Sequence, residues 1–313
     1  MARVVITGAT GLLGRSVWKT FKDCPADTFE WIEAWGGSRT LPGKFKRVDL
    51  SDEERISDAL ADSDPNIVIH CAAIRRPDSI KDDEKLADNV NVRATHKIAE
   101  LVGTKDDCFL LFISTDYVFD GRNPPYTEDA ATCPLNKYGQ QKVEAEKLVL
   151  DTIPEKSAVL RVPIMYGPVE YLGEGAVDEV LKSIVSAPKN KPLRMDHYHK
   201  RYPTHVDDIS QAILRLVQTR IKSPSTVSGV YHIRADECLT KYDMAVQMAE
   251  AFGLPSQHFV ADTSTPDLSK TAARPPDARL SCGRLAQLKI GCNHLFKQSI
   301  YQSLRSHLPS VKQ

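Results

Sequence analysis

Neither sign of charge is in excess, because 41 Lys and Arg residues balance 41 Asp and Glu residues in a chain of 313. Nucleic-acid binders and proteins of anionic membrane surfaces usually carry a basic surplus, so the balance argues against both classes. No apolar run approaches the roughly 18–20 residues that cross a bilayer. Glycines interrupt the apolar start of the chain, where a secretory signal needs a sustained hydrophobic region. We therefore expect a globular protein whose partner is neither a nucleic acid nor a membrane.

Paired cysteine motifs are also absent. The seven cysteines are odd in number and include no CxxC pair, which argues against a disulfide or zinc framework. His197, His199 and His205, with Asp207 and Asp208, could be drawn as a metal cluster. The histidines lack the spacing of a zinc site, and a polar loop before a helix with an acidic first turn explains them. We expect no bound metal and a reducing compartment, namely the cytoplasm, with the nucleus as a second location.

Short apolar runs alternate with helical patterns through the first half of the chain. Continuous apolar strands separated by helices are typical of βαβ units and of a parallel sheet covered on both faces. We predict an α/β fold with a Rossmann-type doubly wound sheet over residues 1–162. The predicted strands are 3–7, 29–35, 66–71, 109–114 and 157–162, and the predicted helices are 13–21, 52–61, 88–102 and 138–150.

The pattern changes after Pro163. We predict a smaller, interleaved C-terminal unit of substrate-binding type over 163–313, with part of 204–235 joining the nucleotide-binding unit. Helical spacing and a β-rich run carry this prediction. The predicted helices are 206–217 and 242–252, the predicted strand is 229–234, and 167–203 and 255–280 show no clean period.

A glycine-rich loop follows the first predicted strand. It reads Gly8-Ala9-Thr10-Gly11-Leu12-Leu13-Gly14, and a helical pattern comes directly after it. This GxxGxxG spacing permits a tight turn, a close approach to a pyrophosphate and packing of helix against strand. The amides and the dipole at the helix N-terminus then favour the phosphate charge. The loop therefore predicts a dinucleotide site.

Two short segments between the second predicted strand and the predicted helix 52–61 bear on the choice of cofactor. NAD-preferring sites usually place a carboxylate at the end of the second strand, where this chain has Ser38 and Arg39 instead. An arginine with a hydroxyl neighbour suits a 2′-phosphate, so we predict NADP(H), although Arg39 could also be a solvated loop residue. Asp49 and Leu50 could flank the adenine.

A second motif concerns the chemistry at the other end of a dinucleotide. Tyr138 and Lys142 form a YxxxK pair on one face of a predicted helix, and Thr115 ends a predicted strand 23 residues before Tyr138. A nearby ammonium should lower the pKa of the tyrosine below its usual 10 and make it a general acid for carbonyl reduction. The same pair could sit on a surface helix without any chemistry.

In these motifs the chain resembles the extended short-chain dehydrogenase/reductase family. The glycine loop, His70-Cys71-Ala72-Ala73, Asn91 and the Thr115–Tyr138–Lys142 set all fit, and STDYVFDG with PLNKYG is most similar to the dTDP-4-dehydrorhamnose reductase branch. Within that branch the chain most resembles the family of regulatory beta subunits of methionine adenosyltransferase. That resemblance rests on stretches such as AIRRPD, MDH, RYPTHV and TKYDM.

The resemblance implies a non-catalytic, NADP-binding protein that associates with the catalytic subunit of methionine adenosyltransferase in a hetero-oligomer and modulates S-adenosylmethionine synthesis. In that family the C-terminal tail contacts the catalytic subunit, and this chain ends in an unlike tail, LPSVKQ. The cofactor contacts it implies, together with those of the glycine loop, fall on Gly8, Thr10, Gly11, Leu12, Leu13, Gly14, Ser38, Arg39, Asp49, Leu50, Cys71, Ala72, Arg75, Tyr138, Lys142 and Met165.

Two readings stay open at this stage. The complete Thr115–Tyr138–Lys142 set also fits an NADPH-dependent reductase of a nucleotide-linked 4-keto sugar, so enzymatic activity is undecided. Arg75 and Arg76 could clamp a phosphate or carboxylate, or lie in a solvated loop. Cys71 is expected to pack as a small buried residue and not to act as a nucleophile.

Overall fold

Seven parallel strands form the main sheet of the computed structural model, which describes residues 1–37, 43–80, 83–188, 190–269 and 271–308. Their order is β10-β6-β5-β4-β1-β2-β3, so the winding reverses between β1 and β4. Ligands of doubly wound sheets bind at this reversal. The strands are β1 (Ala2–Thr7), β2 (Phe29–Gly36), β3 (Phe45–Arg47), β4 (Ile67–His70), β5 (Phe109–Thr115), β6 (Ser157–Val162) and β10 (Gly229–His232).

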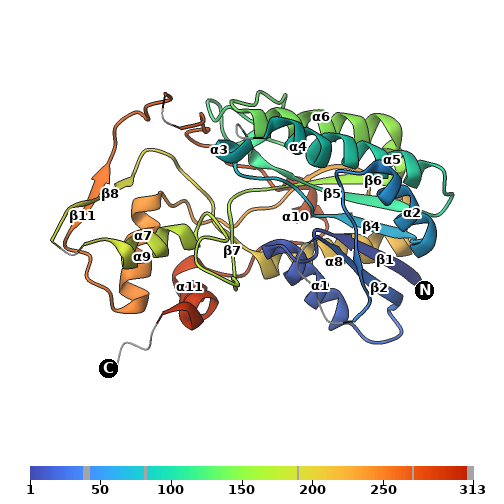
Figure 1. Cartoon of the computed structure of the whole chain (residues 1–313), viewed down its shortest axis with the longest axis horizontal. Helices are drawn as coiled ribbons and strands as arrows, with labels where there is room; N and C mark the ends of the chain where they lie inside the picture. The colour runs from blue at the N-terminus through green and yellow to red at the C-terminus, as the bar shows by residue number, and fades with distance from the viewer. Residues whose placement is uncertain (38–42, 81–82, 189, 270, 309–313) are drawn as a thin grey trace.

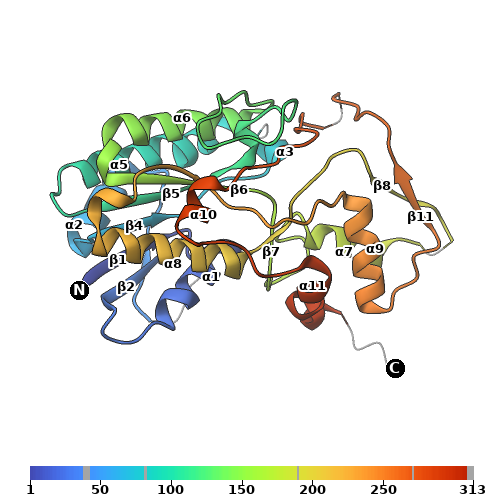
Figure 2. The same ribbon diagram turned by 180° about the vertical axis from the view of Figure 1, so that it is seen from behind.

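The strands are apolar on both faces because both faces are covered. Side chains alternate across a strand, so Val4 and Ile6 enter one core cluster while Val5 enters the other. Helices α1 (Leu12–Lys22) and α8 (Val206–Lys222) cover the first face (Figure 2). Helices α2 (Glu53–Ser63), α5 (Ala94–Gly103) and α6 (Lys137–Thr152) cover the other. The prediction of a Rossmann-type doubly wound α/β sheet is confirmed.

The rest of the chain packs beside the carboxyl ends of the strands. Figure 1 shows α7, α9 and α11 gathered there, away from the layer of α5 and α6. The division of the chain into two units near residue 162 stays a prediction. Helix α8 and strand β10 fall within the predicted joining segment 204–235, and both lie in the layers of the main sheet. The elements are β7 (Met165–Tyr166), α7 (Asp178–Ser186), β8 (Leu193–Asp196), β9 (Thr204–His205), α9 (Lys241–Phe252), β11 (Phe259–Asp262), α10 (Gly283–Gln287) and α11 (Phe296–Leu304).

Three segments differ from the sequence-based expectation. The helix expected over 88–102 begins only at Ala94 and is preceded by α3 (Pro77–Ile80), α4 (Glu84–Asp88) and a π-helical turn, Asn89–Arg93. Within that turn the Asn91 side chain bonds both the amide and the carbonyl of Ile74. The segments without a clean period also contain regular elements. Residues 167–203 include α7 and β8, residues 255–280 include β11, and β8 pairs with β11. In the described part of the chain no helix is long and apolar enough to cross a membrane.

Candidate functional site

The glycine loop turns where β1 meets α1. Gly8 has a φ of +63°, and a Cβ there would lie 2.7 Å from the Ala72 backbone. At Gly14 a Cβ would lie 2.1 Å from the carbonyl oxygen of Gly8, so no larger residue fits. Gly11 caps α1 without a side-chain hydrogen bond, which leaves the first amides of the helix open to an anion. The loop therefore has the geometry of a pyrophosphate site.

The residues predicted in and beside this loop differ in which of their atoms are exposed to a ligand. Leu12 and Leu13 have side chains buried in the core, so only their backbone amides can face a phosphate. Thr10 is also buried, and its carbonyl accepts from the Arg15 guanidinium at 2.8 Å. Ala72 follows β4 and lies beside Gly8, and its amide is 3.4 Å from the Thr7 hydroxyl. The same hydroxyl forms a hydrogen bond with the buried His70 ring.

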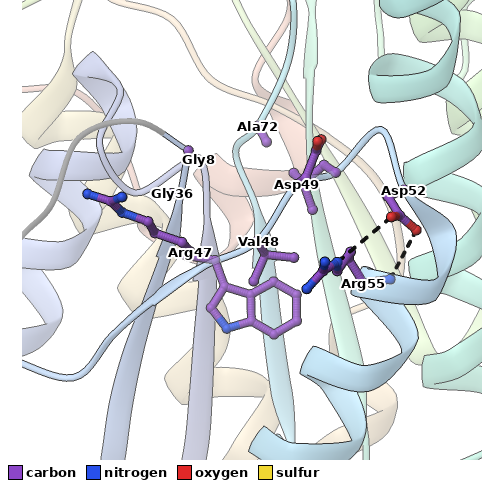
Figure 3. A pocket seen from close by; sticks show the side chains of 11 residues that line it. Gly8, Gly36, Arg47, Val48, Asp49, Asp52, Arg55 and Ala72 are labelled. Atoms are coloured by element: carbon purple, nitrogen blue, oxygen red, sulfur yellow. Dashed lines mark hydrogen bonds and ion pairs between the residues drawn. The ribbon is translucent and has the colours of Figure 1, made fainter.

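A pocket of about 690 Å³ opens beside the loop, at the carboxyl ends of β1, β2 and β3. Figure 3 shows Arg47 and Asp49 leaving the chain on either side of Val48, with Arg47 beside Gly36. Asp49 accepts from the Ser51 hydroxyl, and this hydrogen bond lowers the pKa of its carboxyl. The lining residues are Gly8, Trp35, Gly36, Gly37, Arg47, Val48, Asp49, Leu50, Asp52, Arg55 and Ala72.

This pocket includes two of the predicted adenine contacts and two arginines that the sequence pattern did not single out. Asp49 and Leu50 line it, whereas Ser38 and Arg39 lie outside the described residues. Arg47 and Arg55 were missed. The signal for Arg47 was its place two residues before the predicted contact Asp49.

The three residues expected to act in carbonyl reduction lie at the carboxyl end of β5. Thr115 is the last residue of β5, and its hydroxyl donates to Asp116 at 3.1 Å. Lys142 is buried on α6, and its Nζ donates to the Ile113 carbonyl at 2.6 Å, above the Phe112 ring. Tyr138 lies one turn earlier on α6 and contacts the Tyr117 ring edge-on, with 6.4 Å between centroids.

The expected effect of Lys142 on Tyr138 is wrong for this arrangement. Burial raises the pKa of Tyr138, and nearby Asp116 and Tyr117 raise it further, while Arg75 opposes them. Lys142 is itself desolvated, and burial lowers its pKa to about 7. Its ammonium is bonded to Ile113, so the tyrosine does not gain the electrostatic support that the YxxxK spacing suggested.

Asp116 was missed as a titrating group beside Thr115. It lies half-buried beside Thr115, and desolvation raises the pKa of its carboxyl to about 7 despite the Thr115 hydrogen bond. The sequence placed it in STDYVFDG, directly after Thr115, but no sequence pattern shows that its carboxyl is desolvated.

The remaining predicted residues follow β4 or lie in β7. Burial raises the pKa of the Cys71 thiol to about 12, which suits a packing role and not a nucleophile. Met165 is half-buried in β7, which pairs with β9. Arg75 follows β4, and its guanidinium donates to the Glu174 carbonyl, while its charge acts on Tyr138.

The histidines considered as metal ligands separate in space. His197 bonds the Thr240 hydroxyl and His199 bonds Asp196, whereas His205 and Asp207 lie with His294. The His205 and His294 rings are stacked, with 4.2 Å between centroids. Nδ1 of His205 accepts from the Asp207 amide, and its Nε2 contacts Ser303. Both ring nitrogens of His205 are therefore engaged by protein groups that cap α8 and hold α11.

The fold and the groove define a class. The family model described as RmlD substrate binding domain matches residues 2–308, so the chain belongs to this family. Among solved structures, a dTDP-4-dehydrorhamnose reductase ortholog from Clostridium acetobutylicum superposes with a TM-score of 0.78 at 23% identity, over 97% of this chain and 98% of that one. A Bacillus anthracis dTDP-4-dehydrorhamnose reductase in complex with NADP gives a TM-score of 0.79 at 22% identity, over 97% and 98%.

More similar sequences narrow the assignment. Methionine adenosyltransferase 2 subunit beta of Mus musculus is 41% identical over 302 residues, which are 96% of this chain and 87% of that protein. The Danio rerio protein of the same name is 39% identical, over 96% and 90%. The dTDP-4-dehydrorhamnose reductase of Aggregatibacter actinomycetemcomitans is 29% identical, over 92% and 93%. Within its class the chain thus groups with the methionine adenosyltransferase 2 beta subunits, as its resemblance indicated.

Proposed function

We propose that this chain is a non-catalytic regulatory subunit that associates with the catalytic subunit of methionine adenosyltransferase and modulates S-adenosylmethionine synthesis. The observation that carries this proposal is the 41% identity across 96% of the chain to proteins named as beta subunits. The identity to a named reductase is lower, at 29%. Similarity of this extent covers both the sheet and the C-terminal elements, and therefore more than the shared dinucleotide loop.

The test is a titration of the catalytic subunit from the same source with this chain, at fixed methionine and ATP. A regulatory subunit changes the rate of S-adenosylmethionine formation until a fixed stoichiometry is reached, and further addition then has no effect. Heat-denatured chain is the control for nonspecific protein effects. A rate that stays constant across the titration contradicts the proposal.

We further propose that the dinucleotide is NADP(H). The open amides of α1 suit a pyrophosphate, and Arg47 and Arg55 line the pocket beside the glycine loop, where the adenosine would lie. Arginine binds phosphate through paired hydrogen bonds, so these two residues suit the 2′-phosphate that distinguishes NADP from NAD. Titration calorimetry with each nucleotide tests this choice, and equal affinity for NAD and NADP contradicts it.

The second candidate function is an NADPH-dependent reductase of a nucleotide-linked 4-keto sugar. The convergence of Thr115, Tyr138 and Lys142 at the end of β5 favours it. The raised pKa of Tyr138 makes its phenol a weak acid in this arrangement, which supports the non-catalytic reading. NADPH oxidation with a dTDP-4-keto sugar that Tyr138→Phe abolishes would establish the reductase.

The proposed location is the cytoplasm, with the nucleus as a second compartment. All seven cysteines are free thiols, which suits a reducing environment. Imaging of the fluorescently tagged chain tests this proposal.

A further inference from the structure

One short segment connects the dinucleotide groove to the C-terminal elements. Residues 170–175, here called the clasp, lie between β7 and α7, where the chain passes from the sheet to the C-terminal helices (Figure 1). The Asp178 carboxylate at the start of α7 accepts from the amides of Gly173 and Gly175, at 2.6 and 2.7 Å. The Glu174 carboxylate accepts from the Glu170 amide at 2.8 Å. These bonds give the clasp a defined shape.

A bidentate ion pair ties the clasp to helix α1, directly after the glycine loop. Nη1 and Nη2 of Arg15 donate to the two carboxylate oxygens of Glu174, at 2.7 and 2.8 Å. Only 4% of the Glu174 side chain and 17% of the Arg15 side chain are exposed. Arg15 also donates to the Thr10 carbonyl in the glycine loop. The anchor of the clasp is therefore attached to the loop that would hold the pyrophosphate.

The loop after β4 holds the clasp through hydrogen bonds to two backbone carbonyls. Arg75 donates to the Glu174 carbonyl and Arg76 to the Gly173 carbonyl, and both arginines follow β4. The clasp thus bridges the loops after β1 and β4, the two strands between which the winding reverses. Arg75 also lies close enough to Tyr138 for its charge to lower that pKa. Arg75 therefore contacts the clasp and lies near Tyr138.

We propose that the clasp closes over the middle of the bound dinucleotide and that the Arg15–Glu174 bridge controls how fast the dinucleotide leaves. This inference rests on the proposed NADP(H) binding. A phosphate carries negative charge and can accept two parallel hydrogen bonds from a guanidinium, whereas the Glu174 carbonyl is neutral. The pyrophosphate therefore takes Arg75 from the Glu174 carbonyl, and the Arg15–Glu174 bridge then holds the clasp in place.

Stopped-flow displacement of NADPH measures the release rate directly. Glu174→Gln removes the charge from the bridge at nearly constant size, and we expect NADPH to leave roughly tenfold faster, as the loss of a charged hydrogen bond implies. Arg15→Gln should give a similar increase. Because both variants break the same bridge, the double variant should be little faster than either single variant.

Glu250→Gln is the matched control, because Glu250 forms an exposed ion pair with Lys297 on distant helices. Its release rate should equal that of the wild type. If Glu174→Gln releases NADPH no faster than Glu250→Gln, while the wild type binds NADPH, the clasp is refuted and the cofactor proposal stands. If the wild type binds no NADPH, both proposals fail.

Hydrogen–deuterium exchange of the wild type provides a test that does not depend on any variant folding. NADPH should slow exchange of the amides in residues 168–178 at least as much as those of the glycine loop. Protection of the glycine loop with unchanged exchange over 168–178 would overturn the clasp.

Discussion

Asp116 and Asp120 are four residues apart, and their surroundings shift their carboxyl pKa values in opposite directions. Desolvation raises the pKa of Asp116 to about 7. The pKa of Asp120 is lowered, because its carboxylate accepts hydrogen bonds from the Arg122 amide and the Tyr126 hydroxyl. The two residues therefore make opposite contributions to the pH dependence of folding.

The stability contribution of Asp116 is present below its unfolded pKa of about 3.9 and is lost as the pH rises through about 7. Asp116→Asn imitates the protonated acid, so the variant should gain free energy of unfolding relative to the wild type as the pH rises from 4 to 7. Urea unfolding at several pH values measures this difference. A difference that does not change over this range contradicts the raised pKa.

Asp120→Asn is the control with the opposite sign. The contribution of Asp120 is present above its unfolded pKa of about 3.9 and is lost in acid. The Asn variant should therefore be less stable than the wild type near pH 7, and the deficit should shrink as the pH falls below 4. A variant as stable as the wild type at pH 7 would show that the carboxylate contacts add nothing.

A substitution of Arg47 tests the choice between NADP and NAD. Arg47→Ala removes one guanidinium from the pocket beside the glycine loop, so NADP affinity should fall roughly tenfold while NAD affinity stays constant. Titration calorimetry gives both constants. Arg122→Ala, an exposed arginine outside this pocket, is the control. An equal loss for NAD and NADP would mean that Arg47 does not contact the 2′-phosphate.

The sequence could predict residues whose role is set by local geometry and not those set by distant contacts. Gly8 and Gly14 are required by the turn in which they lie, so their spacing identified the loop. The bridge between Arg15 and Glu174 joins residues 159 positions apart, and no local pattern indicates it. The pKa of Tyr138 was predicted wrongly because spacing places Lys142 on the same helix face but does not show that its ammonium bonds Ile113.

At the scale of elements, the start of α6 fixes where Tyr138 and Lys142 lie. Asn136 caps this helix by accepting from the Gly139 amide at 2.9 Å, and its amide donates to the Ala273 carbonyl at 2.8 Å. The Asn136 residue is 7% exposed. The cap therefore also ties α6 to the segment before α10.

Asn136→Ala should lower the free energy of unfolding by about 2 kcal/mol, because it removes a helix cap and a partly buried hydrogen bond. Asp52→Ala is the matched comparison, because Asp52 caps α2 through Glu54 and Arg55 but is 48% exposed. It should cost about 1 kcal/mol. Equal losses in urea unfolding would show that the Ala273 bond adds no stability.

Elements with strong periodicity were predicted, and short ones paired over long distances were not. Strand β6 occupies the predicted residues, and α1, α6 and α9 begin within one residue of expectation. Strands β8 and β11 have four residues each and pair across more than sixty positions. Only Met195 of β8 and Phe259 of β11 are buried, so these strands lack the continuous apolar run that identified the strands of the main sheet.

At the scale of the whole molecule, the fold is shared by proteins with different printed activities. The structures that superpose on this chain include a dTDP-4-dehydrorhamnose reductase and, at a TM-score of 0.77, a Thermus thermophilus UDP-glucose 4-epimerase complexed with NAD. The fold therefore explains the groove but does not decide between catalysis and regulation. The similarity to beta subunits over nearly the full chain carries that choice.

The measurement that addresses this choice most directly is size-exclusion chromatography of the chain mixed with the catalytic methionine adenosyltransferase of its own source. Both proteins should be folded, and the run should be made with and without NADP. The account predicts that the two proteins elute together, ahead of either one alone. Separate elution in both runs would contradict the regulatory subunit and leave the sugar reductase as the reading to pursue.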